Sequence, residues 1–333
     1  MYPFLYPFGT AGDCLRYVRE NLDWNPAELA VAERLVAKNL IPLKTGTELG
    51  VYLAVSKKLI GAIALRPHKY YRAFEITKAN GKKRTIHAPR VFLKTIQRYI
   101  LDCILAPLQL HEAACGFRRG FSCASGAKRH LKRPFLWNID LQDFFPSIAK
   151  ARVVQAFTDI GYPAGAASLL ASLCCLDERL PQGAPTSPAL ANYIFFPVDA
   201  QISEVARMAN VVYTRYADDL SFSALEPISQ DFQQRVGLIV SGAGFRINNS
   251  KSRLMGPKCC RQVTGLTVNE RISIPREKRR QLRAWFHNVQ KNPAGFTREK
   301  ERLIGFASWV FEHHPAEGRN YLEIAHDIPD EQH

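Results

Sequence analysis

The chain contains no long, uninterrupted run of apolar residues, and we therefore expect no membrane-spanning helix. Its longest apolar stretch, Leu49 to Leu65, is interrupted by Lys57 and Lys58, whereas a spanning helix needs about 20 consecutive apolar residues. The sequence begins with Met1-Tyr2-Pro3-Phe4, which lacks the basic segment of a secretory signal peptide. Internal repeats and low-complexity linkers are also absent, so a solenoid or a chain of tethered modules is not expected.

Metal-binding cysteine motifs and a disulfide framework are missing as well. Eight cysteines occur, but no two have the Cys-x-x-Cys spacing, and four of them form the adjacent pairs Cys174-Cys175 and Cys259-Cys260. Neighbouring residues of a strand point to opposite faces, so adjacent cysteines chelate a metal poorly. We interpret all eight as reduced thiols of a cytoplasmic protein.

Acidic residues are scarce relative to basic ones. The 45 Lys and Arg residues outnumber 30 Asp and Glu, giving a net charge of +15 and a pI near 9.6. This balance predicts a polyanionic partner. Ribosomal and membrane-surface proteins share such a charge, but here the basic residues recur beside aromatic ones, as in nucleic-acid grooves. With 333 residues, the chain can form two or three lobes around a sizeable core.

Two neighbouring carboxylates stand out in this basic chain. The segment Tyr216-Ala217-Asp218-Asp219 lies between the β-prone runs Val211–Arg215 and Leu220–Ser223, a pattern that predicts a β-hairpin. A hairpin tip usually carries Gly or Asn, and adjacent carboxylates repel each other unless a cation joins them. The alternatives are a solvated Asp-Asp turn and a divalent-metal site.

A third carboxylate ends another predicted strand. The apolar run Phe135 to Ile139 leads into Asp140, and the chain is long enough to return from there to a strand beside it. Asp140 next to a hairpin tip with two further carboxylates is a two-metal layout. Metals about 4 Å apart can stabilise the attacking and leaving oxygens of a phosphoryl displacement.

Other segments have clear local preferences. Asn25-Pro26-Ala27-Glu28 has the residues of an N-cap, a first-turn proline and a capping box, and Ser187-Pro188 has the residues of an N-cap and N1. The spacing of Leu282, Trp285, Phe286 and Val289 predicts one apolar helix face. We further expect a helix over residues 48–65, a helix over Val91 to Leu105, and a hairpin with strands Tyr71–Ile76 and Arg84–His87 around an Ala79-Asn80-Gly81 turn.

The order of these motifs resembles that of reverse transcriptases, and retron reverse transcriptases in particular. The resemblance covers roughly residues 48 to 290. It is carried by the fingers segment Gly81–Ile86, the palm motifs Asp140 with Asp143-Phe144-Phe145, Pro181-Gln182-Gly183, Tyr216–Asp219 and Gly244–Lys251, and the segment Val263-Thr264-Gly265-Leu266.

The resemblance implies an α+β fold, a right-hand polymerase with fingers, a palm built on an antiparallel sheet flanked by helices, and a helical thumb. The corresponding parts are an N-terminal helical extension (1–47), fingers (48–137), a palm (138–262, with fingers residues interleaved near 150–190) and a thumb or RNA-binding region (263–333).

The resemblance also implies roles for individual residues. Two Mg²⁺ ions would be held by Asp140, Asp218 and Asp219, and Lys251 matches a lysine that protonates departing pyrophosphate. Arg84 resembles the triphosphate-binding arginine of the fingers, with Lys82 and Lys83 as alternatives. The remaining nucleotide-binding positions are Asp143, Phe144, Phe145, Gln182 and Gly183, and the aromatic ring of Phe145 would exclude a ribose 2′-hydroxyl.

RNA contacts are expected in two regions. Retron enzymes carry Asn-Ala-x-x-His before the catalytic strand, and this chain has Gly126-Ala127-Lys128-Arg129-His130, with Gly in place of Asn. Basic neighbours of His130 favour contact with RNA. The second region combines Val263, Thr264 and Gly265 with the basic residues Arg276, Arg279, Arg280 and Arg283, which suit phosphate contacts.

The family resemblance implies an RNA-directed DNA polymerase that copies a dedicated structured non-coding RNA with dNTPs. It implies priming from an RNA 2′-hydroxyl, a branched RNA–DNA product, and phage defence together with a separate effector protein. A stand-alone group II-like or abortive-infection reverse transcriptase is one alternative. A catalytically inactive RNA-binding scaffold is another, which the presence of all three aspartates disfavours.

Overall fold

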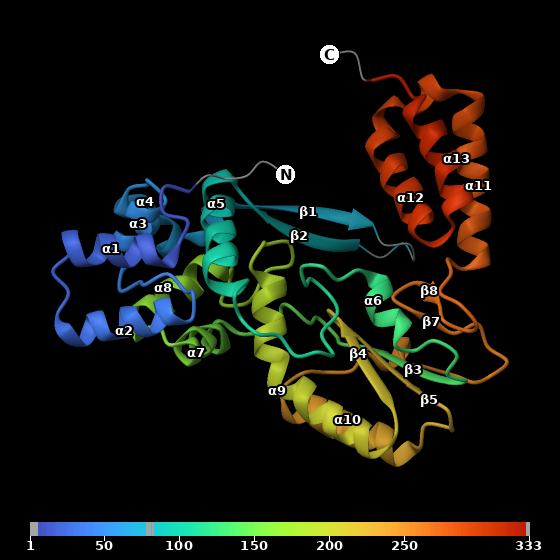
Figure 1. Ribbon diagram of the computed structural model, residues 1–333, viewed down its shortest axis with the longest axis horizontal. Helices are drawn as coiled ribbons and strands as arrows, with labels where there is room; N and C mark the ends of the chain where they lie inside the picture. The colour runs from blue at the N-terminus through green and yellow to red at the C-terminus, as the bar shows by residue number, and fades with distance from the viewer. Residues whose placement is uncertain (1–5, 78–80, 82, 331–333) are drawn as a thin grey trace.

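The structure is a computed structural model that describes residues 6–77, 81 and 83–330. The predicted turn residues Ala79 and Asn80, and Lys82 as an alternative phosphate-binding residue, lie outside this range. Figure 1 shows an elongated molecule with the N-terminal helices at one end, a bundle of C-terminal helices at the other, and a small sheet between them. In the described part of the chain, no helix is both long and apolar enough to cross a membrane.

Short helices make up the N-terminal part: α1 (Ala11–Asn21), α2 (Pro26–Ala37), α3 (Gly46–Tyr52), α4 (Lys57–Leu65) and the 3₁₀ turn η1 (Pro67–Tyr70). The predicted capping box is present, because Asn25 accepts a hydrogen bond from the Glu28 amide and Glu28 accepts one from the Asn25 amide. The prediction of a single helix over residues 48–65 is wrong. The chain leaves α3 after Tyr52, and Ser56 caps a new helix.

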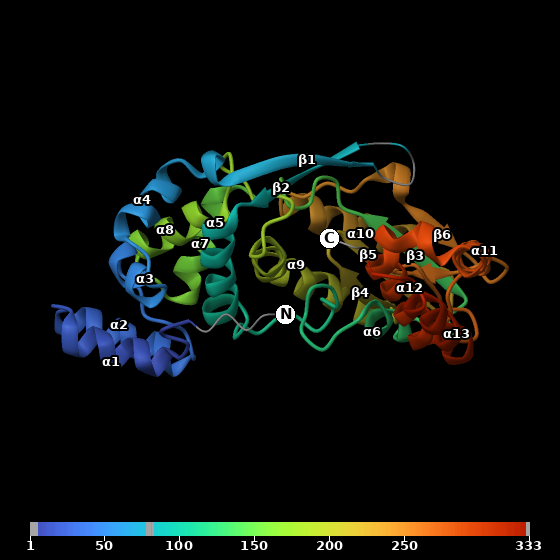
Figure 2. The same cartoon turned by 90° about the horizontal axis from the view of Figure 1, so that it is seen from above.

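A two-stranded antiparallel hairpin extends from this part of the molecule. Its strands are β1 (Tyr71–Thr77) and β2 (Lys83–Pro89), as predicted. The helix α5 (Val91–Ile100) follows and continues into one π-helical turn, η2 (Leu101–Leu105). The hairpin projects from α5 toward the C-terminal helices in both views (Figures 1 and 2).

The central sheet has four antiparallel strands in the order β4-β5-β3-β6. They are β3 (Phe135–Asp140), β4 (Val212–Tyr216), β5 (Asp219–Ala224) and β6 (Arg253–Met255). The Phe222 ring stacks on those of Trp137 and Tyr213 in the neighbouring strands, each at a centroid distance of 5.0 Å. It also meets Phe232 of a covering helix edge-on at 5.6 Å. Aromatic side chains are well suited to a pleated, half-buried surface of this kind.

The remaining helices near the sheet are α6 (Cys123–Lys128), α7 (Lys150–Ile160), α8 (Ala164–Cys174), α9 (Ser187–Met208), α10 (Gln230–Gly242) and the turn η3 (Asn249–Lys251). The α9 cap differs from the prediction by one residue. Thr186 is the N-cap, and the Ser187 hydroxyl instead donates to the Pro181 carbonyl at 2.7 Å. This bond draws the preceding Pro-Gln-Gly turn against the start of α9.

The C-terminal part has its own hydrophobic core. It comprises a short hairpin of β7 (Gln262–Val263) and β8 (Leu266–Thr267), followed by α11 (Arg276–Lys291), η4 (Pro293–Glu299), α12 (Lys300–His313) and α13 (Pro315–His326). Leu282, Phe286 and Val289 are buried as their spacing predicted, and Phe286 stacks on Tyr321 at 4.2 Å. A separate, larger core joins the N-terminal helices to the central sheet.

Candidate active site

Three aspartates line one small pocket at the end of the central sheet. Asp140, the last residue of β3, pairs across the strands with Asp219, the first residue of β5. Asp218 lies in the two-residue turn between β4 and β5. The pocket has a volume of about 410 Å³, and its lining is Arg84, Asn138, Ile139, Asp140, Asp218, Asp219, Lys251 and Arg253. The structure thus brings together residues that lie far apart in the sequence.

Hydrogen bonds fix the turn that carries Asp218. Ala217 has a φ of +55°, a left-handed conformation that L-residues with a Cβ adopt at a cost. The Ala217 carbonyl accepts a hydrogen bond from Arg215 at 3.1 Å, and the Asp218 carbonyl accepts one from the Leu141 amide at 2.8 Å. The second bond ties the turn directly to the end of the strand that carries Asp140.

A fully buried ion pair supports this turn, and the sequence analysis missed it. The Arg215 guanidinium donates to both carboxylate oxygens of Asp199, at 2.9 and 2.6 Å, and to the Asn192 side chain at 2.9 Å. Its face lies 4.6 Å from the ring of Phe195. A charged residue inside the apolar run Val211–Arg215 was the available signal, because a buried charge requires a partner.

The electrostatics of the pocket favour a bound cation. Burial raises the pKa of Asp218, and repulsion from Asp140 raises it further, whereas Lys251 and Arg84 lower it. Loss of hydration is the largest effect on Asp219, and the negative charges of Asp218 and Asp140 add to it. Together they raise the pKa of Asp219 to about 7. Such mutual repulsion is what a divalent cation between carboxylates relieves.

Lys251 compensates part of this negative charge. Its Nζ lies 2.7 Å from Oδ2 of Asp140, and the Asn248 amide donates to the Asp140 carbonyl at 2.8 Å. Half of the Lys251 side chain remains exposed. The lysine can therefore face a ligand while it contacts the carboxylate.

The residues present suit a magnesium ion that shares its ligands with a substrate. Within residues 6–77, 81 and 83–330, no three His, Cys, Asp or Glu side chains stand close enough to enclose an ion by themselves. Mg²⁺ is commonly bound by one or two carboxylates together with phosphate oxygens and water. Asp140 and the turn with Asp218 match that requirement.

The fingers hairpin contributes Arg84 to the pocket. Arg84 is half-buried, lines the pocket and lowers the pKa of Asp218 through its charge. The alternative Lys83 instead pairs with Glu75 at 2.7 Å on the exposed surface of the hairpin. Of the two described alternatives, only Arg84 faces the aspartates.

The Gln182-Gly183 turn contacts the same hairpin. The Gln182 carbonyl accepts a hydrogen bond from the His87 amide at 2.8 Å. Gly183 has a φ of +122°, and a Cβ at this position would lie 2.8 Å from both the His87 carbonyl oxygen and the Ile86 side chain. A glycine is thus required for the approach of this turn to β2, whereas Gln182 stays half-exposed.

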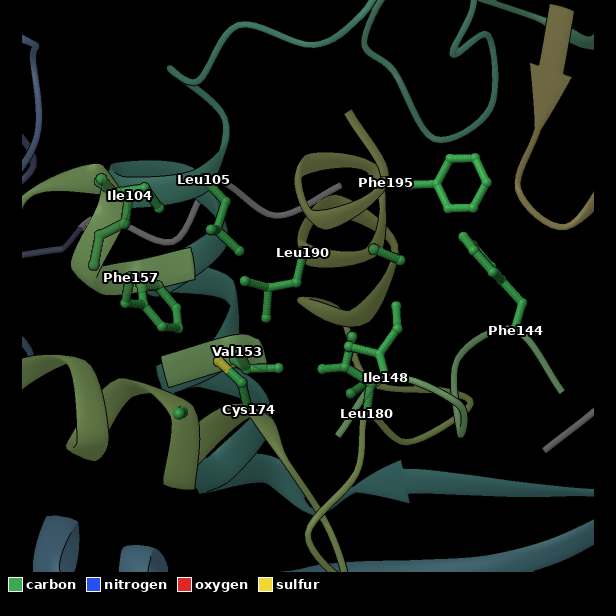
Figure 3. Close-up of a cluster of buried hydrophobic side chains, with 14 of the residues drawn as sticks. Ile104, Leu105, Phe144, Ile148, Val153, Phe157, Cys174, Leu180, Leu190 and Phe195 are labelled. Atoms are coloured by element: carbon green, nitrogen blue, oxygen red, sulfur yellow. The ribbon is translucent and has the colours of Figure 1, made fainter. Parts of the chain in front are cut away.

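Three residues after β3 were predicted to bind the nucleotide, and for Phe144 this prediction is wrong. It is 3% exposed and packs against Phe195 and Phe245, each at 5.7 Å, so it belongs to the core and cannot contact a nucleotide. Figure 3 shows its ring turned toward Phe195 of α9. Asp143 is exposed, with a φ of +48°, and Phe145 is half-buried.

The expected RNA contact of His130 is also wrong. The side chain is completely buried, and its two ring nitrogens lie 2.7 Å from the hydroxyls of Ser223 and Thr214. Burial lowers the pKa of His130 to about 3, so the ring is neutral and joins two strands of the sheet. Gly126 is buried too, and a Cβ there would lie 3.3 Å from the side chain of Cys115.

The Val263-Thr264-Gly265 segment forms the tip of the β7–β8 hairpin. Val263 is fully buried, so the prediction that its side chain contacts RNA is wrong. Thr264 and Gly265 have φ angles of +49° and +80°, the two positive values of a type I′ turn. The Thr264 hydroxyl donates to the Cys123 carbonyl at 2.8 Å, which joins the hairpin to α6.

The four predicted RNA-binding arginines gather on one surface. They line a pocket of about 470 Å³ between α11 and the β7–β8 hairpin: Arg276, Arg279, Arg280 and Arg283. They differ in charge compensation, since Glu317 lies 2.5 Å from Arg279 and 3.5 Å from Arg283. Arg276 and Arg280 are exposed.

Comparison with known proteins agrees with this geometry. Residues 76–281 match the family of reverse transcriptases, RNA-dependent DNA polymerases. The Retron Ec86 reverse transcriptase of Escherichia coli is 37% identical over 245 residues, covering 72% of this chain and 75% of that protein. The Retron Mx162 reverse transcriptase of Myxococcus xanthus is 33% identical over 330 residues, covering 87% and 68%.

Among solved structures, telomerase from Candida albicans in complex with a fragment of telomeric RNA aligns with a TM-score of 0.47 and 13% identity, over 79% of this chain and 57% of that one. The matched family segment contains strand β2 with Arg84, all three pocket aspartates and Lys251. This chain belongs to the retron reverse transcriptases, a group of RNA-directed DNA polymerases.

Proposed function

We propose that the pocket of Asp140, Asp218 and Asp219 is a two-magnesium polymerase centre. One observation carries the proposal: the carboxylates of Asp140 at the end of β3, Asp218 in the β4–β5 turn and Asp219 at the start of β5 share a pocket of about 410 Å³ with cationic side chains. Magnesium bound there would lower the pKa of the primer hydroxyl and neutralise charge on the leaving pyrophosphate. Asp140 and Asp218 would be the principal ligands, and Asp219 would complete the cluster.

The chain's own residues would then position a deoxynucleoside triphosphate. The planar guanidinium of Arg84 suits phosphate oxygens, and Lys251 would donate a proton to the departing pyrophosphate. Asp143 and Gln182 would contact the nucleotide, with Gly183 holding the turn of Gln182 in place against β2. The ring of Phe145 would lie under the sugar and leave no room for a 2′-hydroxyl.

We further infer that the enzyme copies one dedicated, structured non-coding RNA in the cytoplasm, where its nucleotide substrates are found. Synthesis would begin from a 2′-hydroxyl of that RNA and yield a branched RNA–DNA molecule that acts in phage defence with a separate effector protein. The similarity to named retron reverse transcriptases supports this proposal. The arginine pocket beside the β7–β8 hairpin would contribute phosphate contacts to the RNA.

Expression with the native flanking DNA tests the priming chemistry. Small nucleic acids would be extracted and treated with ribonuclease or with a debranching enzyme before electrophoresis. A species that shortens under either treatment is the expected result. Linear cDNA from arbitrary primers alone would contradict dedicated 2′-priming and favour a stand-alone reverse transcriptase.

A further inference from the structure

Three residues close in sequence or space to the aspartates have a left-handed backbone. Phe117, Asp143 and Ala217 have φ angles of +56°, +48° and +55°, a region that residues with a side chain seldom occupy. Phe117 is the least expected of the three, because a bulky aromatic residue gains nothing from a left-handed conformation. Strain of this kind persists where the surrounding structure enforces it, often at functional sites.

The segment before Phe117 is fixed to the β4–β5 turn that carries Asp218. The Cys115 amide donates to the Arg215 carbonyl at 2.8 Å, and the Asn192 side chain donates to the Gly116 carbonyl at 2.9 Å. A Cβ on Gly116 would lie 2.9 Å from the Ala217 amide nitrogen. The backbone contact with the turn therefore fixes the position of the Phe117 backbone, from which the ring extends.

The Phe117 ring reaches two aromatic residues of the site. Its centroid lies 6.4 Å from that of Phe145, in an edge-on orientation, and 6.0 Å from that of Tyr216. The ring of Phe145 also contacts that of the buried Phe144, with centroids 5.4 Å apart. Phe145 therefore contacts one core ring and one ring, that of Phe117, whose residue is 52% exposed.

An exposed aromatic residue in a strained conformation contributes little to the core. Phe117 belongs to neither buried cluster, and its described aromatic contacts are with Phe145 and Tyr216. Its edge-on contact with the partly buried Phe145 limits how far the phenyl group can tilt toward Phe117. Edge-on aromatic pairs favour one relative orientation of the rings.

We propose that Phe117 is a positioning residue for sugar selection: its ring holds Phe145 in the orientation that excludes a ribose 2′-hydroxyl. This inference rests on the proposed role of Phe145. Without the Phe117 ring, the Phe145 phenyl group tilts into the vacated space and the nucleotide pocket admits ribonucleotides more readily. Incorporation of dNTPs depends less on this orientation, because a deoxyribose has no group at the guarded position.

The test compares single-nucleotide incorporation of an rNTP and the matching dNTP on an RNA template. Phe117→Ala is expected to raise the ratio of rNTP to dNTP efficiency about three- to tenfold, the factor that corresponds to one aromatic contact. Phe117→Tyr keeps the ring and should leave the ratio at the parent value. Phe121→Ala is the matched control, because Phe121 is an exposed aromatic residue of the same loop that stacks with Arg118 instead.

Phe145→Ala separates the two proposals. If Phe145→Ala raises the ratio and Phe117→Ala does not, the positioning role is overturned while the Phe145 gate stands. If Phe145→Ala leaves the ratio unchanged, both proposals fail. An equal rise with Phe121→Ala would indicate a general loop effect and would also overturn the positioning role. In the supporting case, Phe117→Ala adds nothing to the ratio of a Phe145→Ala variant.

Discussion

At the residue scale, a buried ion pair supports the turn that places Asp218 in the pocket. This turn depends on Arg215, whose guanidinium is fully buried against Asp199 and donates a hydrogen bond to the Ala217 carbonyl. Burying both charges has a large desolvation cost, which their mutual contacts offset. Removing one partner leaves the other charge without compensation.

Arg215→Met should therefore destabilise the protein by about 3–5 kcal/mol, the usual cost of breaking a buried pair. Denaturant unfolding measures this loss. The double variant Arg215→Met with Asp199→Asn removes the orphaned charge and should recover part of the stability. Equal stability of Arg215→Met and the parent would show that the ion pair does not hold the turn.

His130 gives a pH dependence whose sign follows from burial. Its pKa is about 3 in the folded protein and about 6.5 in an unfolded chain. Between these values the unfolded chain binds the proton, so stability is complete above about pH 6.5 and falls as the pH is lowered. The loss is about 1.4 kcal/mol per pH unit, or about 2 kcal/mol at pH 5.

The free energy of unfolding at pH 7 and pH 5 checks this prediction. His130→Gln lacks a titrating ring, so its stability should change about 2 kcal/mol less over this interval than that of the parent. Parallel pH profiles for the two proteins would contradict it.

At residue scale, the sequence predicted which polar side chains meet better than it predicted which side chains are buried. Asp140, Asp218, Asp219 and Lys251 meet at one pocket, as the order of their short motifs implied. Phe144 and His130 lie within the same kinds of motif but point inward. Which side of a strand end faces the core depends on the packed neighbours, and local sequence does not contain them.

At the scale of elements, close backbone contacts join the β1–β2 hairpin to the turn that precedes α9. The turn before α9 approaches β2 so closely that Gly183 has no room for a side chain. The strands themselves were predicted from alternation and an Asn-Gly pair. The break between α3 and α4 was missed because Ala54, with a φ of +53°, gives no turn signal in the sequence.

Gly183→Ala should destabilise the protein by about 1–3 kcal/mol through backbone strain and reduce DNA synthesis, since the added methyl group displaces β2 and with it Arg84. Gly237→Ala is the matched control, because this helical position has open space around it and alanine favours helix. Thermal unfolding and primer extension on both variants measure the effects. A Gly183→Ala variant as active and stable as the control would refute the close contact.

At the scale of the whole molecule, the net charge of +15 favours binding of a polyanion to the protein surface. The C-terminal arginine pocket concentrates this charge, but Glu317 neutralises part of it. Exposed Arg280 and ion-paired Arg279 should therefore differ in their effect on RNA binding. Sequence alone could not separate them, because their partner lies on another helix.

Arg280→Ala should weaken binding to all RNAs. It should also make the negative slope of log K against log salt shallower by about one unit. Arg279→Ala breaks the bond to Glu317 and should reduce the stability of the C-terminal helices as well, whereas Arg280→Ala leaves stability unchanged. Filter binding at several salt concentrations and thermal unfolding distinguish the two. An unchanged salt slope for Arg280→Ala would remove this residue from the RNA surface.

The central claim is that the three aspartates form a metal-dependent centre for RNA-directed DNA synthesis. RNA-templated primer extension with dNTPs in magnesium tests it most directly, comparing the parent enzyme with Asp218→Asn. Because burial and repulsion raise the pKa of Asp218, its charged form destabilises the fold, so the variant should be at least as stable and should still bind RNA. We predict that its DNA synthesis falls to background. Sustained magnesium-dependent synthesis by Asp218→Asn would contradict the account.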